Sequence, residues 1–402
     1  IDAYNQLGTT LARLERYPEA ITTYKQALQL CPEAAEILNN LGIAQRESGQ
    51  IEAAIDSYRQ ALALLPEFPE AYHNLAHAET DLERYEQAEA HAREAIQLAP
   101  DYAEAYNQLG ITLNAAGRSQ EAITHYHKAL ELQNDSAEFY NNLAIAQKQT
   151  EQWDPSEQNY RKALSLAPET SIFHTNLANL LKERGRCDEA LHHYHHAIER
   201  EPDNADARWN RALCHLLNGD FEAGWQDYRW RNQAPLETQL YLHQYRKPQW
   251  QGQDFSGQRL LIHSEQGLGD TLQFIRYLPL VKARGGTVIL ETWSELQSLL
   301  QTIPGIDEIV ATTTQPYPEE RYDLYTSIMD LPGLFDCNLT NLPSHVPYIT
   351  ADVGLTKVWQ KRFDPSTLNI GLVWAGRPTH GNDKNRSCQL RHFIPLLQQP
   401  GL

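Results

Sequence analysis

The feature that most constrains the fold of this chain is an internal repeat of 34 residues. When the sequence is shifted by that length, leucines and small residues fall on one another. One row is Leu7, Leu41, Leu75, Leu109, Leu143 and Leu177, and a second is Ala27, Ala61, Ala95, Ala129, Ala163 and Ala197. Apolar residues at helical spacing give each helix one packed stripe. The period therefore predicts a stack of helix–turn–helix units.

Aromatic residues and prolines complete the pattern. A third row consists of Tyr24, Tyr58, Tyr126, Tyr160 and Tyr194, interrupted by Ala92. Prolines stand where the second helix of a unit must stop, and Gly8, Gly42 and Gly110 let two helices approach closely. Together these residues resemble the tetratricopeptide repeat (TPR) family. The resemblance covers six full repeats over 1–204 and a degenerate seventh from Ala205 to Arg231, which implies a right-handed α-superhelix over 1–231.

A carboxamide precedes the shared leucine of every repeat. The row consists of Gln6, Asn40, Asn74, Gln108, Asn142, Asn176 and Asn210. A carboxamide both donates and accepts hydrogen bonds, so a ladder of them suits the recognition of a peptide backbone. The row is similar to the asparagine ladder in the TPR arm of O-linked N-acetylglucosamine transferases. The alternative is that these amides cap or bridge neighbouring helices.

Charge and cysteine content narrow the function classes. Residues 1–234 carry 36 acidic and 20 basic side chains, whereas the remainder carries 16 and 14. This acidity argues against nucleic acid or an anionic membrane as the partner of the repeats. Five scattered cysteines without a CxxC pair favour a reducing cytoplasm. Because the chain begins with Ile1 and its only methionine is Met329, we expect it to be a fragment.

Histidines cluster near the end of the repeat half, at His192, His193, His195 and His196. His192 with His195 or His196 has the i,i+3 or i,i+4 spacing at which two imidazoles on a helix can chelate a metal ion. No carboxylate or thiol completes the set, so we predict a solvated helix face and no metal.

The pattern changes after Arg231. Residues 232–258 read as a linker, and the chain then alternates between strands and helices. We predict strands at Arg259–Ser264, Thr287–Glu291 and Glu308–Ala311 with a possible fourth at Tyr322–Ser327, and helices at Asp270–Gly285 and Glu295–Ile303. This order predicts a parallel, Rossmann-like α/β sheet with its ligand at the carboxyl ends of the strands.

The loop EQGLGD lies between the first predicted strand and its helix. Its two glycines let the backbone come close to a ligand, but it is no GxGxxG dinucleotide fingerprint. Asp270 ends this loop and allows two interpretations. It could be a helix N-cap that forms a capping box with Gln273, or it could be a catalytic base at the mouth of a cleft.

The segments EQGLGDTLQFIRYLP, TVILET, PGIDEIV, MDLP, VPYI and IGLVWAG…HGNDKNRS occur in an order that resembles one bacterial family. These are TPR proteins with a C-terminal GT-B glycosyltransferase module related to the heptosyltransferases. The resemblance implies that Asp270 is the general base, with Gln266, Gly267 and Gly269 in the acceptor loop. It also implies that Lys384, with Arg386 and Ser387 beside it, contacts the donor phosphates without a metal ion.

The same resemblance implies the domain order. Residues 259–368 would form the N-terminal GT-B domain, and 369–402 would begin a second Rossmann-like domain, with its first strand at Asn369–Ala375 and its first helix at Arg391–Gln398. We expect the superhelix to dock on the first domain through Trp209, Trp225, Trp230 and Trp250. Because most of the donor site would be missing, we expect residues 1–402 alone to be nearly inactive.

Two functions follow from these expectations. The first is a cytoplasmic glycosyltransferase that takes a nucleotide sugar, needs no cofactor, and receives a protein or peptide acceptor from the TPR groove. The second is a scaffold that binds protein partners and carries a vestigial transferase domain. Neither requires nucleic acid or a membrane.

Overall fold

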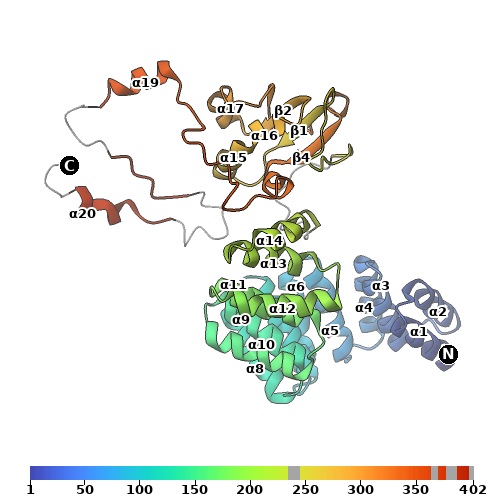
Figure 1. Cartoon of the computed structure of the whole chain (residues 1–402). Helices are drawn as coiled ribbons and strands as arrows, with labels where there is room; N and C mark the ends of the chain where they lie inside the picture. Colours follow the sequence, from blue (N-terminus) through green and yellow to red (C-terminus); the bar gives the residue numbers. More distant parts are fainter. Residues whose placement is uncertain (234–244, 364–369, 377–386, 398–402) are drawn as a thin grey trace. The chain divides into compact units, whose positions relative to one another are not determined.

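The computed structural model describes residues 1–233, 245–363, 370–376 and 387–397 (Figure 1). The chain divides into two compact units, Ile1–Gln239 and Leu240–Leu402. Unit 1 is helical, and unit 2 contains a small parallel sheet.

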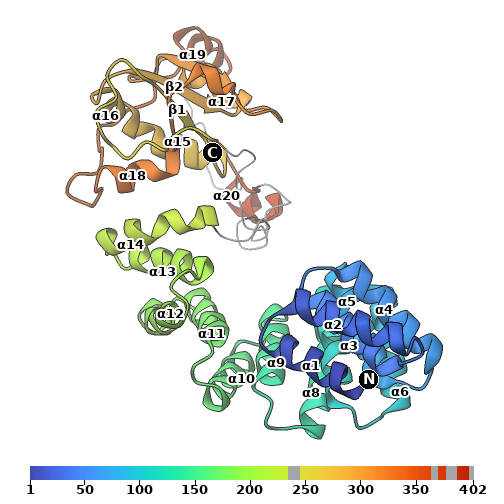
Figure 2. The ribbon, with the colours of Figure 1, turned by 90° about the vertical axis from the view of Figure 1, so that its right-hand side faces the viewer.

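Unit 1 consists of seven helix pairs that follow one another in chain order (Figure 2). The pairs are α1 (Asp2–Arg13) with α2 (Tyr17–Leu30), α3 (Ala35–Glu47) with α4 (Ile51–Leu64), α5 (Pro69–Asp81) with α6 (Tyr85–Leu98), α7 (Ala103–Ala115) with α8 (Ser119–Leu132), α9 (Ala137–Gln149) with α10 (Trp153–Leu166), α11 (Ser171–Glu183) with α12 (Cys187–Arg200), and α13 (Ala205–Leu217) with α14 (Phe221–Tyr228). The predicted helical repeat solenoid is thus confirmed, and its seventh pair has a shortened second helix.

The small residue and the tyrosine of a repeat pack directly against each other. Tyr58 is fully buried, and a Cβ atom added to Gly42 would lie 2.5 Å from its ring. The pairs Gly8–Tyr24 and Gly110–Tyr126 are equally close. In the third repeat both positions are alanine, Ala76 and Ala92, and both are buried in one cluster. The fifth and sixth repeats pair an alanine with the tyrosine, Ala144 with Tyr160 and Ala178 with Tyr194, so the tyrosine packs against either small residue.

Gly42→Ala is expected to lower the free energy of unfolding by about 1–3 kcal/mol, because the buried Tyr58 ring must move to admit the methyl group. The loss should appear although alanine is the better helix former by about 1 kcal/mol. Urea unfolding of the whole chain, followed by circular dichroism, measures it. Gly269→Ala is the control, since a Cβ there meets nothing within 4 Å. Equal stability of both variants would contradict the packing argument.

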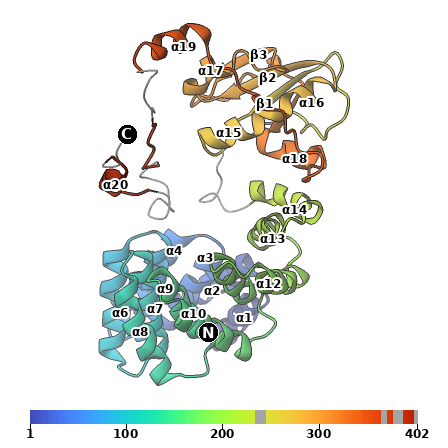
Figure 3. The same ribbon diagram turned by 60° about the vertical axis from the view of Figure 1, so that its left-hand side comes forward.

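In its described part unit 2 is built on four parallel strands in the order β3-β2-β1-β4, and three of them, β1, β2 and β3, are labelled in Figure 3. They are β1 (Arg259–His263), β2 (Thr287–Thr292), β3 (Glu308–Ala311) and β4 (Leu324–Ser327). All four predicted strands are found within two residues of their expected bounds, and the parallel sheet is confirmed. The assignment of this sheet to a GT-B fold stays a prediction.

The helices of unit 2 are shorter than expected. They are α15 (Leu268–Phe274), α16 (Leu278–Lys282), α17 (Ser294–Leu300), α18 (Leu331–Leu334), α19 (Val353–Gln360) and α20 (Ile394–Leu397). The single helix predicted over 270–285 was wrong, because a 3₁₀ turn at Ile275–Tyr277 separates α15 from α16. Pro279 lies in the first turn of α16 and has no N–H to continue a preceding helix. The apolar spacing was nevertheless correct, since Ile275, Leu278 and Val281 are fully buried.

The two faces of the sheet are covered differently. Leu261 of β1 and Ile289 of β2 pack with tyrosines that come from loops and from β4. These tyrosines are Tyr245, Tyr317, Tyr322 and Tyr325. Side chains alternate along a strand, so Leu260, Ile262 and Val288 point to the opposite face, and all three are fully buried. A sheet with a tyrosine cover has room for polar groups beside the rings.

The segment expected to be a linker that leads onto a new domain, 232–258, is described only in part. Residues 234–244 lie outside the described part, and from Tyr245 onward the chain packs on the sheet. The backbone N–H of Trp250 donates to the Tyr325 carbonyl at 2.8 Å, and the Trp250 side chain is fully buried. How the tryptophans of the two units relate to one another stays a prediction.

The expected start of a second Rossmann-like domain is found only in part. Arg391–Gln398 was predicted to be helical, and a 3₁₀ turn (Leu390–Phe393) and α20 lie there. Asn369 is outside the described residues, and residues 370–376 form no strand. Val373 is 90 % exposed, so this apolar segment has no sheet neighbour among the described residues.

Candidate functional site

The carboxamide row of unit 1 bridges neighbouring repeats. Four asparagines donate from Nδ2 to the Oδ1 of an asparagine in the preceding repeat. The bonds are Asn40 to Asn5 at 2.9 Å, Asn74 to Asn39 at 2.9 Å, Asn142 to Asn107 at 3.1 Å and Asn176 to Asn141 at 2.9 Å. This is the bridging that the alternative interpretation expected. All four donors are partly exposed, and their binding to a peptide stays a prediction.

The ladder changes at two boundaries. Gln108 faces a repeat that has His73 where the first, second, fourth and fifth repeats have asparagine, and its amide donates instead to Thr80 Oγ1 at 3.2 Å. Asn210 is buried and donates to the Asp206 carboxylate at 2.7 Å, while Lys182 donates to its Oδ1. Asn210 and Gln108 are therefore the two buried residues of the row, and they have the least surface to offer a peptide.

The variant Asn74→Ala/Asn142→Ala/Asn176→Ala is expected to lower the free energy of unfolding by about 3 kcal/mol. Each substitution removes one inter-repeat hydrogen bond, which contributes about 1 kcal/mol. Gln6→Ala is the control, since Gln6 is the exposed residue at this position of the first repeat. Equal urea midpoints for the triple variant and the parent would contradict the bridging role.

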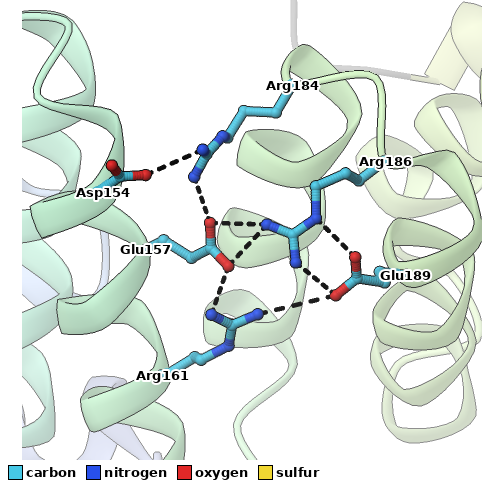
Figure 4. Close-up of polar contacts among 6 residues, drawn as sticks. All are labelled: Asp154, Glu157, Arg161, Arg184, Arg186 and Glu189. Carbon is cyan, nitrogen blue, oxygen red and sulfur yellow. Dashed lines mark hydrogen bonds and ion pairs between the residues drawn. The ribbon is translucent and has the colours of Figure 1, made fainter.

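The boundary between the fifth and sixth repeats is held by a buried carboxylate (Figure 4). Glu157 of α10 has a side chain that is 7 % exposed, and three arginines contact it. They are Arg161 on the same helix, Arg184, and Arg186, whose Nη1 is 2.8 Å from the carboxylate. Burial acts to raise the Glu157 pKa, but the Arg186 hydrogen bond and the arginine charges outweigh it and lower the pKa below its ordinary value.

The predicted loop EQGLGD lies at the carboxyl edge of the sheet in unit 2. Its helix, α15, begins at Leu268, so Asp270 is the third helical residue and not the N-cap. The Asp270 carboxylate is half-buried and accepts a hydrogen bond from the Gly267 backbone N–H at 2.9 Å. Asp270 therefore closes the first turn from inside the helix. The predicted capping box with Gln273 was wrong, because the helix starts two residues earlier than expected.

The sharp turn of this loop is made by Gln266 and not by the glycines. Gln266 has a φ of +62°, in the left-handed region that favours glycine, whereas Gly267 has a φ of −102°. A non-glycine residue in that region costs about 1 kcal/mol or more and persists where its surroundings fix it. Gly269 is helical, and a Cβ there would meet nothing within 4 Å. Gly269 thus leaves open space beside the loop, whereas a Cβ on Gly267 would lie 3.2 Å from the Asp270 carboxylate.

Glu265 is a residue at this edge that the sequence did not single out. It directly follows β1, it is 3 % exposed, and its carboxylate accepts a hydrogen bond from Ser327 Oγ at the end of β4. Ser327 Oγ in turn accepts from the Met329 backbone N–H at 3.0 Å. Buried carboxylates are costly unless they are paired, so Glu265 fixes the loop that carries Gln266. Glu265 and Ser327 are 62 positions apart in the sequence, and only the order of the strands brings them together.

A second polar pair lies at the end of β2. Glu291 is buried, and Tyr245 donates its hydroxyl to the Glu291 carboxylate at 2.6 Å. The same tyrosine ring stacks on His263 with ring centroids 5.1 Å apart. On the other face Ser264 donates to Thr292 Oγ1 at 3.0 Å. The carboxyl ends of three neighbouring strands thus carry buried polar side chains, at the edge where parallel sheets bind ligands.

The residues expected to hold a donor phosphate are only partly described. Lys384 and Arg386 lie outside the described residues. Ser387 Oγ accepts a hydrogen bond from the Gly376 backbone N–H at 2.7 Å.

The part of the chain that the structure describes contains neither a cluster of metal ligands nor a membrane-spanning helix. No three His, Cys, Asp or Glu side chains there converge as ligands of a metal ion. None of the helices there has the length and hydropathy that a membrane span requires. The predicted solvated face at His192–His196 is partly exposed, and its imidazoles pack against one another.

The helix pairs and the ladder define unit 1 as a helical repeat protein that binds through its repeats. A tetratricopeptide repeat model matches residues 1–67, 67–135 and 101–169, and a second one matches 175–229. The N-terminal part of this chain belongs to the tetratricopeptide repeat family.

Individual proteins share this part of the chain. FlbA of Caulobacter vibrioides is 27 % identical over 218 residues, which cover 50 % of this chain and 36 % of FlbA. The chain thus spans about a third of the length of that relative. TTC0263, a TPR protein of Thermus thermophilus, is 25 % identical over 46 % of this chain and 100 % of its own, with a TM-score of 0.42. YrrB, a TPR protein with an unusual peptide-binding site, is 18 % identical over 46 % of this chain and 95 % of its own, with a TM-score of 0.35.

Proposed function

We propose that this chain is part of a glycosyltransferase in which the repeats bind a protein or peptide acceptor and unit 2 contributes the catalytic base. TPR proteins bind peptide or protein partners, so the role of unit 1 rests on its family. The role of unit 2 rests on the resemblance of its segments to bacterial TPR glycosyltransferases.

The observation that carries the proposal is the position of the EQGLGD loop. It follows β1 in a parallel sheet and contains the half-buried Asp270 with open space at Gly269. Ligands of such sheets bind outside the carboxyl ends of the strands. Buried polar residues at the ends of β1, β2 and β4 hold that edge in one conformation.

In the proposed reaction the acceptor hydroxyl attacks the anomeric carbon of a nucleotide sugar, and the bond from that carbon to the diphosphate breaks. Asp270 takes the hydroxyl proton, with Gln266, Gly267 and Gly269 alongside the acceptor. Lys384, Arg386 and Ser387 neutralise the departing nucleotide diphosphate, so no metal ion is needed.

The five cysteines form no disulfide in the described part of the chain, which supports a cytoplasmic location.

A scaffold without catalysis is the second candidate, and one observation favours it. The Asp270 carboxylate already accepts the Gly267 N–H, which is a complete structural reason for an aspartate at that position. In this case the repeats alone would carry the function, and unit 2 would be a vestigial domain.

The release of nucleotide diphosphate separates the two candidates. The full-length protein is incubated with UDP-, GDP- and ADP-sugars, with and without protein from a cell extract as acceptor. A transferase releases diphosphate from at least one donor, faster with acceptor, and Asp270→Asn abolishes most of that release. A scaffold releases none from any donor, and that outcome would contradict the proposal.

A further inference from the structure

Four histidine rings form a closed cluster in the sixth repeat. His174 is on α11, and His192, His193 and His196 are on α12. The centroids of neighbouring rings are 5.3 Å apart for 174–193, 5.5 Å for 193–192, 4.6 Å for 192–196 and 5.2 Å for 196–174. We call these four residues the histidine tetrad. Since each ring touches two others, a charge on one ring is felt by its neighbours.

The hydrogen bonds of His174 in the tetrad require that its own ring is neutral. His174 Nε2 is 2.9 Å from the Pro168 carbonyl, which only accepts, so Nε2 carries a proton. A neutral His174 therefore accepts at Nδ1, and its partner there is His193 Nδ1 at 3.1 Å. Two nitrogens at this distance share one proton. A second proton between them would place two N–H groups against each other and break the contact.

The two carboxylates near the tetrad, Glu189 and Glu199, give a protonated ring little stabilisation, because one is already paired with arginine and the other is exposed. Arg161 of α10 acts on His193 with a like charge. Glu189 on α12 is already paired with Arg186 and lies near Arg161. Glu199 is 3.6 Å from His196 but is largely exposed. On the far side of α12, His195 faces His215, which is paired with Asp220.

We propose that the histidine tetrad is a proton-sensitive joint, which packs α11 against α12 while it is neutral and loosens the sixth repeat when it is protonated in mildly acid solution. Burial, followed by the charges of the other three histidines and of Arg161, lowers the pKa of His193 to about 4. Burial also lowers the pKa of His174, against an opposing effect of the Pro168 hydrogen bond.

The sign of the effect follows from these pKa values. The open form of the repeat takes up protons near the ordinary histidine pKa of 6.5, whereas folded His193 takes up its proton only near pH 4. The contribution of His193 to the stability of the sixth repeat is therefore fully present above pH 6.5 and is lost as the pH falls from 6.5 to about 4. For His193 alone, the equilibrium constant for opening rises about tenfold between pH 7.5 and pH 5.5.

Hydrogen–deuterium exchange of the full chain at pH 7.5 and pH 5.5 tests the proposal, with rates corrected for the intrinsic pH dependence of exchange. Residues 171–200 should open about tenfold more readily at pH 5.5, relative to residues 2–30, which contain no histidine. His193→Gln should remove most of that difference. His127→Gln should leave it unchanged, because His127 is exposed on α8. Equal responses of the two regions, or an unchanged response in His193→Gln, would overturn the proposal.

A second measurement remains decisive if His193→Gln does not fold. Exchange of the imidazole C2 hydrogen, followed by mass spectrometry of the parent chain, reports the pKa of each histidine. His193 should titrate well below the ordinary histidine value of 6.5. If His193 titrates at or above 6.5, the tetrad tolerates protonation and is no joint.

Discussion

Asp270→Asn in the full-length protein is expected to reduce the turnover of sugar transfer at least about a hundredfold and to leave the fold stable. A general base contributes about 10²–10⁴-fold, and an asparagine amide does not take up the acceptor proton. The structural role of Asp270 survives the change, because the amide oxygen of asparagine can accept the Gly267 N–H in place of the carboxylate. Turnover is measured as nucleotide diphosphate release, and stability as the thermal midpoint.

Asp352→Asn is the matched control for this experiment. Asp352 is the N-cap of α19 and accepts the Leu355 N–H at 2.7 Å, so the same chemical change meets a comparable capping bond outside the proposed site. Both variants should have the same thermal midpoint as the parent, and only Asp270→Asn should lose turnover. Near-normal turnover of Asp270→Asn would leave Asp270 with its structural role alone.

Glu157→Gln is expected to lower the free energy of unfolding of the repeat unit by about 3 kcal/mol at pH 7. The value of about 3 kcal/mol is the low end of the range for removing one partner of a buried ion pair. We choose the low end because the three arginines keep contact with water, which screens their charges. The amide keeps the shape of the carboxylate but leaves three positive charges without their shared anion. Urea unfolding at low salt, followed by the helix signal, measures the loss.

The same residue gives the chain an acid-dependent stability. Because folding lowers the Glu157 pKa, its contribution is present above the ordinary value of 4.5 and is lost as the pH falls through the lower folded value. This window lies below most of the range in which the histidine tetrad acts. The stability of Glu157→Gln should therefore depend less on pH below 4.5 than that of the parent.

Glu189→Gln is the control for the Glu157 variant. Glu189 contacts Arg186 and Arg161 in the same network, but its side chain is 52 % exposed. Exposed ion pairs contribute little, so this variant should lose much less stability than Glu157→Gln. If the two variants are equally destabilised, burial is not what makes Glu157 important.

The repeat unit was predictable from the sequence because its information is local and periodic. The leucine, alanine and tyrosine rows fix helix faces, and the prolines fix helix ends, so all seven pairs were expected. The strands of unit 2 were predictable for a similar reason, since each is a short apolar run between turn residues. Local patterns of this kind do not depend on which distant segments come together.

What the sequence missed depends on distant partners. The bond between Asn74 and Asn39 joins residues 35 positions apart, and nothing near either residue distinguishes a bridging amide from a peptide-binding one. Ser327 and Glu265 meet only because β4 lies beside β1. The start of α15 was misjudged because Gln266, and not a glycine, takes the left-handed conformation that ends the loop.

The matched packing pairs of unit 1 limit how genetic recombination can change this protein. Unequal crossing-over at a repeat boundary adds or deletes a whole 34-residue period and keeps every pair together, whether it is Gly42 with Tyr58 or Ala76 with Ala92. A crossover inside a repeat, between the small residue and the aromatic one, would join Gly42 to the alanine of the third repeat and leave a void the size of a tyrosine ring. Lineages of this protein should therefore differ in repeat number more readily than by chimaeric repeats.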